Sequence, residues 1–282
     1  MAFNVKTFYT RATTALVFVA LLLGCVWYSC YSFAAFFTIV GLIGLNEYNK
    51  MAKKCGKQAI GFANYLLHVL FIYSVFYGGI FDMNGILPIL LALILLVPIF
   101  LIIKLFSKKS FSFNDYSFLI PFAYVTLPCM LLILMSNSHN AIMYSEIFVP
   151  QKVLGMIFFV WINDTGAYFV GSFFGKHKLY EKISPNKTWE GTLGGIAFCI
   201  GLSFVVAQIF PQLAQIHWLA ISIIVAVFGN LGDLVESMLK RQAGVKDSGT
   251  LMPGHGGVLD RFDSLFFATP FVFCYLALMG LL

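Results

Sequence analysis

The chain has 282 residues, of which 60% are hydrophobic and 11% are charged, with a formal net charge of +6. Soluble domains carry about 25% charged residues, so this composition excludes an ordinary soluble domain and also a disordered chain. Continuous apolar runs recur along the sequence, without the repeated period-two alternation that a membrane β-barrel requires. The sequence therefore predicts an all-α polytopic membrane protein.

Apolar windows of roughly 20 residues, the length that crosses a bilayer, predict about nine transmembrane helices. We place them near residues 13–31, 33–48, 64–81, 86–103, 116–135, 153–174, 191–210, 217–236 and 264–281. We expect two regions. Residues 1–150 hold the first five helices, which would serve packing, lipid access and a candidate dimer contact. Residues 151–282 hold the last four helices and the loops that carry the candidate chemistry.

The basic residues predict how the chain is oriented in the membrane. With nine spans, the N-terminus and the loops near 49–63, 104–115, 175–190 and 237–263 share one side. They hold 17 of the 18 lysines and arginines, and only Lys152 falls on the other side. Because positively charged short loops stay in the cytoplasm, we expect a cytoplasmic N-terminus and a C-terminus outside. This topology accounts for most of the net charge, which gives no indication of nucleic-acid binding.

Ionisable residues are distributed unevenly among the predicted helices. In the first five, only His68 lies inside an apolar run, where we expect it to pack against neighbouring helices. Asp164 lies inside the sixth predicted helix and Asp233 late in the eighth. A carboxylate within a span costs ~2.5–3.5 kcal/mol, so it normally faces a polar cavity. We expect this of both aspartates; the alternative for each is a simple hydrogen bond to a neighbouring helix.

The segment S-P-N-K-T-W-E-G, residues 184–191, leads into the seventh predicted helix. Serine followed by proline is a common helix start, so we expect a helix to begin at Ser184-Pro185. Free amides there, with Ser184, Lys187 and Thr188, would offer hydrogen-bond donors and positive charge to a phosphate. A plain helix cap with one topology lysine would give the same pattern.

Residues 237–264 combine basic, acidic and glycine residues. Lys240, Arg241 and Lys246 could hold a polyanion. A glycine-rich turn that includes Gly256 and Gly257 would let backbone amides approach a ligand. A merely solvated charge run is the alternative, but it would leave the acidic residues that follow unexplained.

Those acidic residues are Asp260 and Asp263, which share a helix face if the ninth helix begins there. Asp233 and Asp260 come from two different helices and lie next to lysines and glycines. Mg²⁺ takes one or two carboxylates and completes its octahedron with water and phosphate oxygens. The sequence therefore predicts a seat for Mg²⁺ and phosphates at the cytoplasmic ends of the last helices.

The segment from Ser237 to Asp263 resembles the signature of the CDP-diacylglycerol synthases, or phosphatidate cytidylyltransferases. Its pattern is S-x-hydrophobic-K-R, four residues, K-D-x-G, and then H-G-G-x-x-D-R-x-D, without a departure. Residues 184–191 are similar to the S-P-x-K-T-x-E-G loop of that family, and residues 164–168 to its D-x-x-A-Y span. The resemblance covers residues 160–265, whereas the first 150 agree only in being hydrophobic spans.

The resemblance implies an enzyme that condenses CTP with phosphatidate to CDP-diacylglycerol and pyrophosphate, using Mg²⁺, often with K⁺. It implies a homodimer in a membrane, expected here to be a bacterial inner membrane, with the active site facing the cytoplasm. Asp233 and Asp260 would be metal ligands, with Asp263 assisting. Contacts to phosphates or nucleotide are implied for Ser184, Lys187, Thr188, Lys240, Arg241, Lys246 and His255, and further substrate contacts for Asp164, Gly256, Gly257 and Arg261.

The chemistry agrees with the residue types. A phosphate monoester, with a second pKa near ~6, is mostly ionised at neutral pH, so its oxygen needs no strong general base to attack the α-phosphorus of CTP. It needs relief from anion repulsion and in-line placement, which metals and lysines provide. We therefore expect His255 to donate a hydrogen bond or to shape the turn rather than to remove a proton.

Three other functions would account for some of these sequence features. A cation-coupled transporter could use Asp164 and Asp233, but it needs no long charged and glycine-rich loop, and we find no internal repeat. A phosphotransferase that consumes CDP-activated lipids would carry a D-G-x-x-A-R run, which is missing. An inactive relative that serves as a scaffold would not be expected to keep the acidic residues intact.

Overall fold

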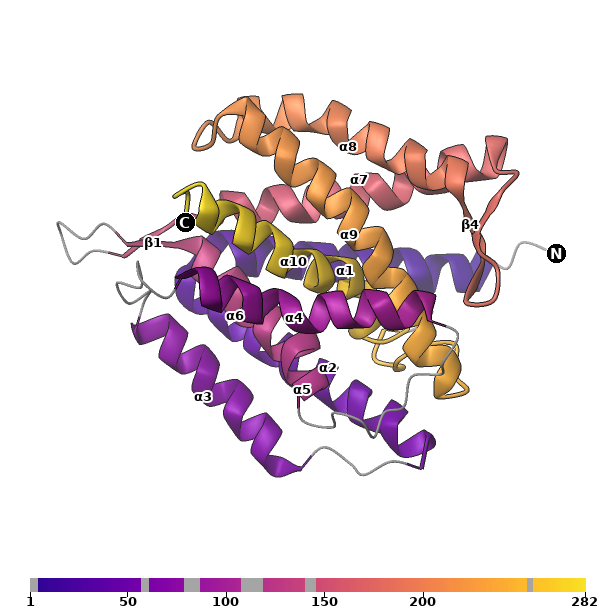
Figure 1. Cartoon of the computed structure of the whole chain (residues 1–282), viewed down its shortest axis with the longest axis horizontal. Coiled ribbons are helices and arrows are strands. Elements are labelled where there is room, and N and C mark those ends of the chain that lie inside the picture. Colours follow the sequence, from indigo (N-terminus) through magenta and orange to yellow (C-terminus); the bar gives the residue numbers. More distant parts are fainter. Residues whose placement is uncertain (1–4, 57–60, 79–86, 108–118, 140–145, 253–255) are drawn as a thin grey trace.

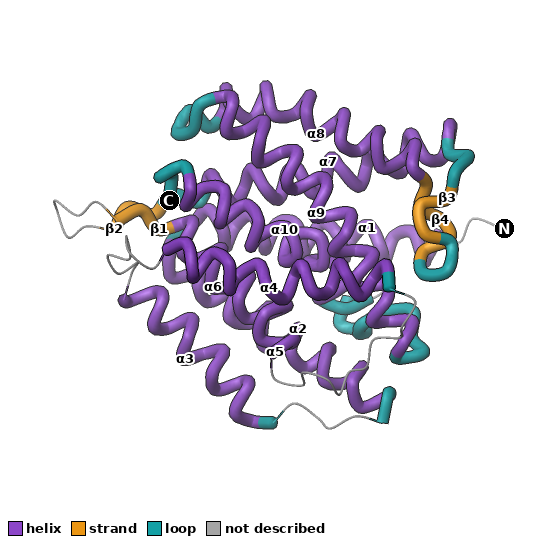
Figure 2. Tube along the Cα trace, viewed as in Figure 1, coloured by secondary structure: helices purple, strands orange, loops and turns teal. Residues whose placement is uncertain are grey.

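The computed structural model describes residues 5–56, 61–78, 87–107, 119–139, 146–252 and 256–282. These residues form a bundle of long helices with two short antiparallel hairpins (Figures 1 and 2). The helices are α1 (Val5–Tyr28), α2 (Cys30–Lys54), α3 (Phe62–Gly78), α4 (Leu87–Phe106), α5 (Leu119–Pro121), the π-helix η1 (Phe122–Thr126), α6 (Leu127–Ser136), α7 (Gln151–Phe174), α8 (Trp189–Ile209), α9 (Gln215–Gln242) and α10 (Leu259–Leu278). The hairpins pair β1 (Asn137–His139) with β2 (Glu146–Phe148), and β3 (Lys178–Tyr180) with β4 (Ser184–Thr188).

The helices confirm the prediction of an all-α polytopic membrane protein. Each predicted span overlaps a helical segment, with α5, η1 and α6 together matching residues 116–135. Among the described residues, seven helices are long and apolar enough to cross a membrane, and the apolar segments 12–28 and 62–76 are shorter. Large apolar side chains lie exposed along α1, α3, α4 and α8, as expected of surfaces that contact lipid. The number nine and the orientation stay predictions.

The π-helix η1 interrupts the segment from α5 to α6 for a local reason. In a regular α-helix the ring of Pro128 would clash with the carbonyl of Tyr124, four residues earlier, and proline has no amide hydrogen to donate to it. A single π-helical turn just before the proline absorbs this mismatch. The segment therefore stays continuous from residue 119 to residue 136.

The two hairpins lie at opposite ends of the bundle. The start of α1 and hairpin β3–β4 are at one end, and the C-terminus and hairpin β1–β2 are at the other (Figure 1). Lys152, the lysine predicted to lie apart from the rest, is buried at the start of α7, and its Nζ donates to the carbonyl of Leu281 at 2.6 Å. Lys152 thus lies beside residue 281, at the end of the bundle opposite the hairpin β3–β4.

Small residues let the helices of the C-terminal half approach closely. Gly166 of α7 faces the ring of Phe198 of α8, and Gly232 of α9 lies against the backbone of Asp263 in α10. A Cβ at either glycine would collide with these neighbours. Such close contacts between backbones are typical of packed membrane helices and leave the site between α7, α8, α9 and α10 well defined.

Gly155 of α7 provides a test of this packing. Its Cα faces the fully buried ring of Trp218, whose Nε1 donates to the carbonyl of Phe210 at 2.9 Å. We predict that Gly155→Ala destabilises the protein by about 1–3 kcal/mol, because the added methyl overpacks a well-filled core. The measurement is the midpoint of thermal unfolding in detergent. Gly201→Ala in α8 is the control, since nothing lies within 4 Å of a Cβ there, and equal midpoints would contradict the prediction.

Candidate functional site

A cavity of about 530 Å³ lies between α7, α8 and α9, beside the hairpin β3–β4. This volume falls in the usual range of small-ligand sites. Asp164 of α7 and Asp233 of α9 line the cavity, together with Lys187 and Thr188 of β4. Both intramembrane aspartates therefore line one cavity together with other polar side chains, in the arrangement that we expected.

Lys187 reaches Asp233 across this cavity. The Nζ of Lys187 lies 2.6 Å from Oδ2 of Asp233, and the hydroxyl of Ser237, one turn further along α9, donates to Oδ1 at 3.3 Å. The Asp233 side chain is 33% exposed, so its carboxylate is open to the cavity. A phosphate in this cavity would meet a lysine held in place by the hairpin and a carboxylate beside it.

Thr188 ends the hairpin and begins α8. Its backbone is extended, and its Oγ1 accepts a hydrogen bond from the amide of Gly191 at 3.2 Å, which makes it the N-cap of the helix. The expectation that a helix begins at Ser184-Pro185 is wrong. Residues 184–188 instead pair with 178–180 as strand β4, because the chain satisfies their backbone groups by folding back on β3.

Two buried asparagines join α7 to α9 next to Asp164. The Nδ2 of Asn230 donates to Oδ1 of Asn163 at 3.2 Å and to the carbonyl of Ala226 at 2.7 Å. Asn163 directly precedes Asp164, and its Nδ2 lies 3.5 Å from Oδ1 of that aspartate. The bond between Asn230 and Asn163 holds α7 against α9 at the level of Asp164.

A second cavity, of about 200 Å³, adjoins the first at Asp164, which lines both. Asp260, Arg261 and Asp263 of α10 line its polar side, and the apolar side includes Phe18 of α1. Because α10 begins at Leu259, Asp260 and Asp263 share one face, as predicted. Asp263 is buried, and its Oδ1 accepts from the amide of Ser264 at 2.6 Å.

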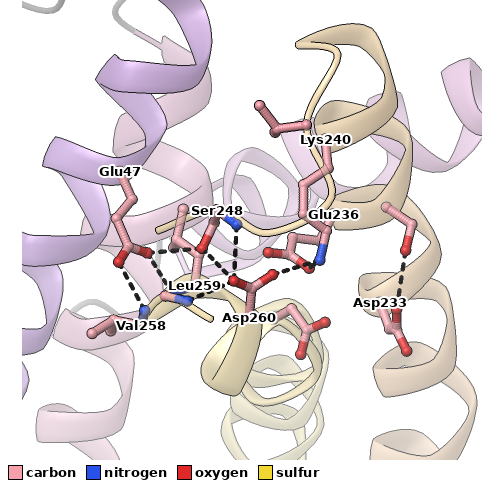
Figure 3. A network of polar contacts seen from close by, with 12 residues as sticks. Glu47, Asp233, Glu236, Lys240, Ser248, Val258, Leu259 and Asp260 are labelled. Atoms are coloured by element: carbon pink, nitrogen blue, oxygen red, sulfur yellow. Dashed lines mark hydrogen bonds and ion pairs between the residues drawn. The ribbon is translucent and has the colours of Figure 1, made fainter. Parts of the chain in front are cut away.

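Asp260 is held by three segments of the chain (Figure 3). Its Oδ1 accepts from Nζ of Lys240 at 2.6 Å. Its Oδ2 accepts from the amides of Gly257 and Ser248 at 2.7 and 2.8 Å, and the hydroxyl of Ser248 lies 2.9 Å away. The Asp260 side chain is only 6% exposed, so this set of donors fixes the carboxylate in one orientation.

Two buried glutamates belong to this network and were missed by the sequence reasoning. Glu236 is fully buried and lies 2.5 Å from Nζ of Lys240, which is four residues further along α9. The i,i+4 spacing of these two residues was the available signal. Lys240 therefore lies between two carboxylates, those of Glu236 and Asp260, with only 12% of its side chain exposed.

The second glutamate, Glu47, corrects the expectation that only His68 is ionisable inside the first five spans. Glu47 lies within α2, which continues to Lys54, and its side chain is buried. Glu47 lies on the same helix face as Val40 and Met51, and this spacing could have predicted that its side chain is buried. His68 is also buried, with its ring nitrogens 3.1 Å from Oγ1 of Thr126 and 3.2 Å from the carbonyl of Thr38, which confirms its packing role.

The remaining candidates that the structure describes do not line the two cavities. Ser184 begins β4, and the exposed Arg241 donates to the carbonyl of Val245 at 3.3 Å. Lys246 lines a separate opening with Lys50, Lys53 and Lys54. Gly256 adopts the left-handed conformation, φ +83°, that the turn before α10 requires, and Gly257 donates its amide to Asp260. His255 lies outside the described residues.

No group of three or more His, Cys, Asp or Glu side chains in the described part of the chain is arranged to hold a metal ion by itself. The donor set nevertheless fits Mg²⁺, which needs only one or two carboxylates when phosphates and water supply the rest. Asp164 shares one cavity with Asp233 and the other with Asp263, an arrangement of like charges that a cation would relieve. The assignment of Asp233, Asp260 and Asp263 as metal ligands stays a prediction.

The chain is similar in sequence to known cytidylyltransferases. A sequence model described as the cytidylyltransferase family matches residues 9–279. A phosphatidate cytidylyltransferase of Bacillus subtilis (strain 168) is 38% identical over 246 residues, 86% of this chain and 87% of that protein. Phosphatidate cytidylyltransferases of Staphylococcus epidermidis and Staphylococcus saprophyticus are 46% identical over 167 residues, 58% of this chain and 60% of each relative.

Lys240 provides a test of the buried network. We predict that Lys240→Met lowers the free energy of unfolding by about 3–5 kcal/mol, because it leaves the carboxylates of Glu236 and Asp260 buried without their cation. Thermal unfolding in detergent measures the effect. Arg241→Met, which alters the exposed neighbouring residue, should shift the midpoint little, and a Lys240→Met midpoint equal to that control would refute the assignment.

Proposed function

The chain belongs to the cytidylyltransferase family, and we propose that it is a nucleotidyltransferase that condenses CTP with phosphatidate to CDP-diacylglycerol and pyrophosphate. In the reaction, an oxygen of the lipid phosphate forms a bond to the α-phosphorus of CTP. The bond from that phosphorus to the oxygen of the β-phosphate breaks, and pyrophosphate leaves. The observation that carries the proposal is the polar cavity in which Lys187 of the S-P-N-K-T segment faces Asp233.

The two adjoining cavities suit the two substrates. The larger cavity, with Lys187, suits the triphosphate, because a lysine and the hydroxyl and amide groups around it offer positive charge and donors. The smaller cavity combines Arg261 with apolar side chains such as Phe18 and Trp161, which suits a phosphate attached to acyl chains. Asp164 lines both, so the lipid phosphate and the α-phosphorus would meet beside it.

The chain's own residues are proposed to act mainly by placement and charge. The lipid phosphate is already ionised at neutral pH, so no side chain has to remove a proton. Lys187 would offset the repulsion between the two anions and orient the triphosphate. Lys240 would hold Asp260 in position through the ion pair it makes with that carboxylate. Asp233 and Asp260, with Asp263 assisting, would hold Mg²⁺, which when bound neutralises phosphate charge and stabilises the leaving group.

The cellular setting follows from the same reasoning. We propose a bacterial inner membrane protein, since the relatives named above are bacterial. We place the active site on the cytoplasmic side, because 17 of the 18 basic residues fall on one side of the predicted topology. We also propose that the protein forms a homodimer and that it uses a monovalent cation such as K⁺ together with Mg²⁺.

Asp233→Asn and Asp260→Asn test the metal assignment. With radiolabelled CTP, phosphatidate in mixed micelles and Mg²⁺, we predict that the purified protein forms CDP-lipid and pyrophosphate. Each variant should lose activity by at least about 100-fold, because a neutral amide replaces a carboxylate that helps to stabilise phosphate charge.

The control for this experiment is Glu181→Gln, which changes an exposed carboxylate in the turn of the β3–β4 hairpin and should keep full activity. Size-exclusion chromatography checks that each variant assembles. Undiminished turnover in the Asp233 and Asp260 variants would remove the metal assignment. Solute counterflow in sealed vesicles without CTP, with no CDP-lipid formed, would favour a transporter.

Lys187→Gln tests the triphosphate site. We predict that kcat/KM for CTP falls about 10–100-fold, because a hydrogen bond to a charged group contributes about 1.5–3 kcal/mol. Lys178→Gln is the matched control, since Lys178 lies on the facing strand β3, where its side chain is exposed. Equal values of kcat/KM in the two variants would show that Lys187 does not contact the nucleotide.

A further inference from the structure

Glu47 is a buried carboxylate that the proposed reaction does not use. It comes from α2, in the first half of the chain, and only 3% of the residue is exposed. Among the described residues no lysine or arginine forms an ion pair with it. A carboxylate in such a place is expensive unless hydrogen-bond donors surround it.

The donors that surround Glu47 all come from the segment that carries Asp260 (Figure 3). Its Oε1 accepts from the amide of Val258 at 2.9 Å, and its Oε2 from the amide of Leu259 and the hydroxyl of Ser248, both at 2.9 Å. Val258 and Leu259 form the start of α10, where backbone amides have no partner within the helix. Glu47 therefore serves as the cap of α10, supplied by a distant helix.

Ser248 links the two carboxylates. Its hydroxyl lies 2.9 Å from Oε2 of Glu47 and 2.9 Å from Oδ2 of Asp260. Its own amide also donates to Asp260. A shift of the Glu47 carboxylate would thus move both the hydroxyl and the first turn of α10, which are the two supports of Asp260 on the side away from Lys240.

Two glycines show how tightly this contact is built. A Cβ at Gly249 or at Gly257 would collide with the carboxylate of Glu47, and at Gly257 also with the hydroxyl of Ser248. The backbone of the segment 248–259 can approach Glu47 only because these positions have no side chain. The close approach requires both glycines.

We propose that Glu47 is a positioning residue for the cytidylyl transfer, which fixes Asp260 through Ser248 and the first amides of α10. This inference rests on the proposed function. It assigns the first half of the chain a part in the site: α2 holds the segment of the second half that presents the carboxylate. Asp260 is then held on one side by the ion pair with Lys240 of α9. On the other side it is held by Ser248 and the start of α10, which Glu47 of α2 binds.

Glu47→Gln is the main test. Glutamine has nearly the same size, but only one of its two terminal atoms accepts a hydrogen bond, and its amide group would face a donor. We expect kcat to fall about 10–100-fold, the usual effect of losing a group that orients a metal-binding carboxylate, while KM for CTP changes less than about twofold. Ser248→Ala should also lower kcat, and the losses should combine less than additively in the double variant, because both act through Asp260.

Amide hydrogen exchange provides a readout that does not depend on activity. In the full-length protein in detergent, exchange in the peptide that covers residues 256–262 should be at least about tenfold faster in Glu47→Gln than in the wild type. Asn49→Leu is the control. Asn49 is a buried polar residue on the same helix whose Nδ2 donates to the hydroxyl of Tyr65, so its loss should lower thermal stability without changing this peptide or kcat.

Three results would overturn the proposal: unchanged exchange in Glu47→Gln, faster exchange with unchanged kcat, or an equal loss of kcat in Asn49→Leu. Failure of the proposed function looks different. In that case the wild type itself forms no CDP-lipid, and the role of Glu47 in the reaction falls with it. The exchange measurement still decides whether Glu47 holds the segment.

Discussion

A carboxylate enclosed by apolar helices must find hydrogen-bond donors or a cation, and this constraint organises the whole site. Asp260 accepts from Lys240 and from the amides of Ser248 and Gly257, Glu47 accepts from two backbone amides, and the one hydrogen of the Ser248 hydroxyl is shared between the two acids. These partners come from the end of α9, from the loop that follows it and from the start of α10. The hydrogen bonds to these two carboxylates therefore connect α2, the end of α9, the following loop and the start of α10.

The same constraint distinguishes the acids that support the site from those available to a ligand. Glu47 and Glu236 are almost fully enclosed: both oxygens of Glu47 accept from donors within the chain, and Glu236 forms an ion pair with Lys240. Asp233 is one third exposed and meets Lys187 at the edge of the larger cavity. An anionic ligand would therefore approach the edge of the larger cavity, where Lys187 lies beside the accessible carboxylate of Asp233. The enclosed network would hold the neighbouring helices in place.

Much of this arrangement could be predicted from the sequence, because its signals are local. Apolar runs locate the helices, and the cost of a charge in a span indicates that Asp164 and Asp233 face a polar cavity. The start of α8 could not be predicted, since the pairing of residues 178–180 with 184–188 outweighs the serine-proline signal. Glu47 was missed for a similar reason: the partners of Glu47 lie more than 200 residues further along the chain.

The order of the network fits a reaction that needs placement more than proton transfer. An ionised phosphate attacks without a base, so the barrier depends on bringing two anions together in line and holding their charge. In the proposed mechanism, the two adjoining cavities that share Asp164 would provide the meeting point. If Asp260 binds the metal as proposed, a displacement of an ångström there would spoil the alignment. The enclosure of that carboxylate between α2 and α9, which buries Glu47 and Glu236, would then serve the chemistry by keeping Asp260 in place.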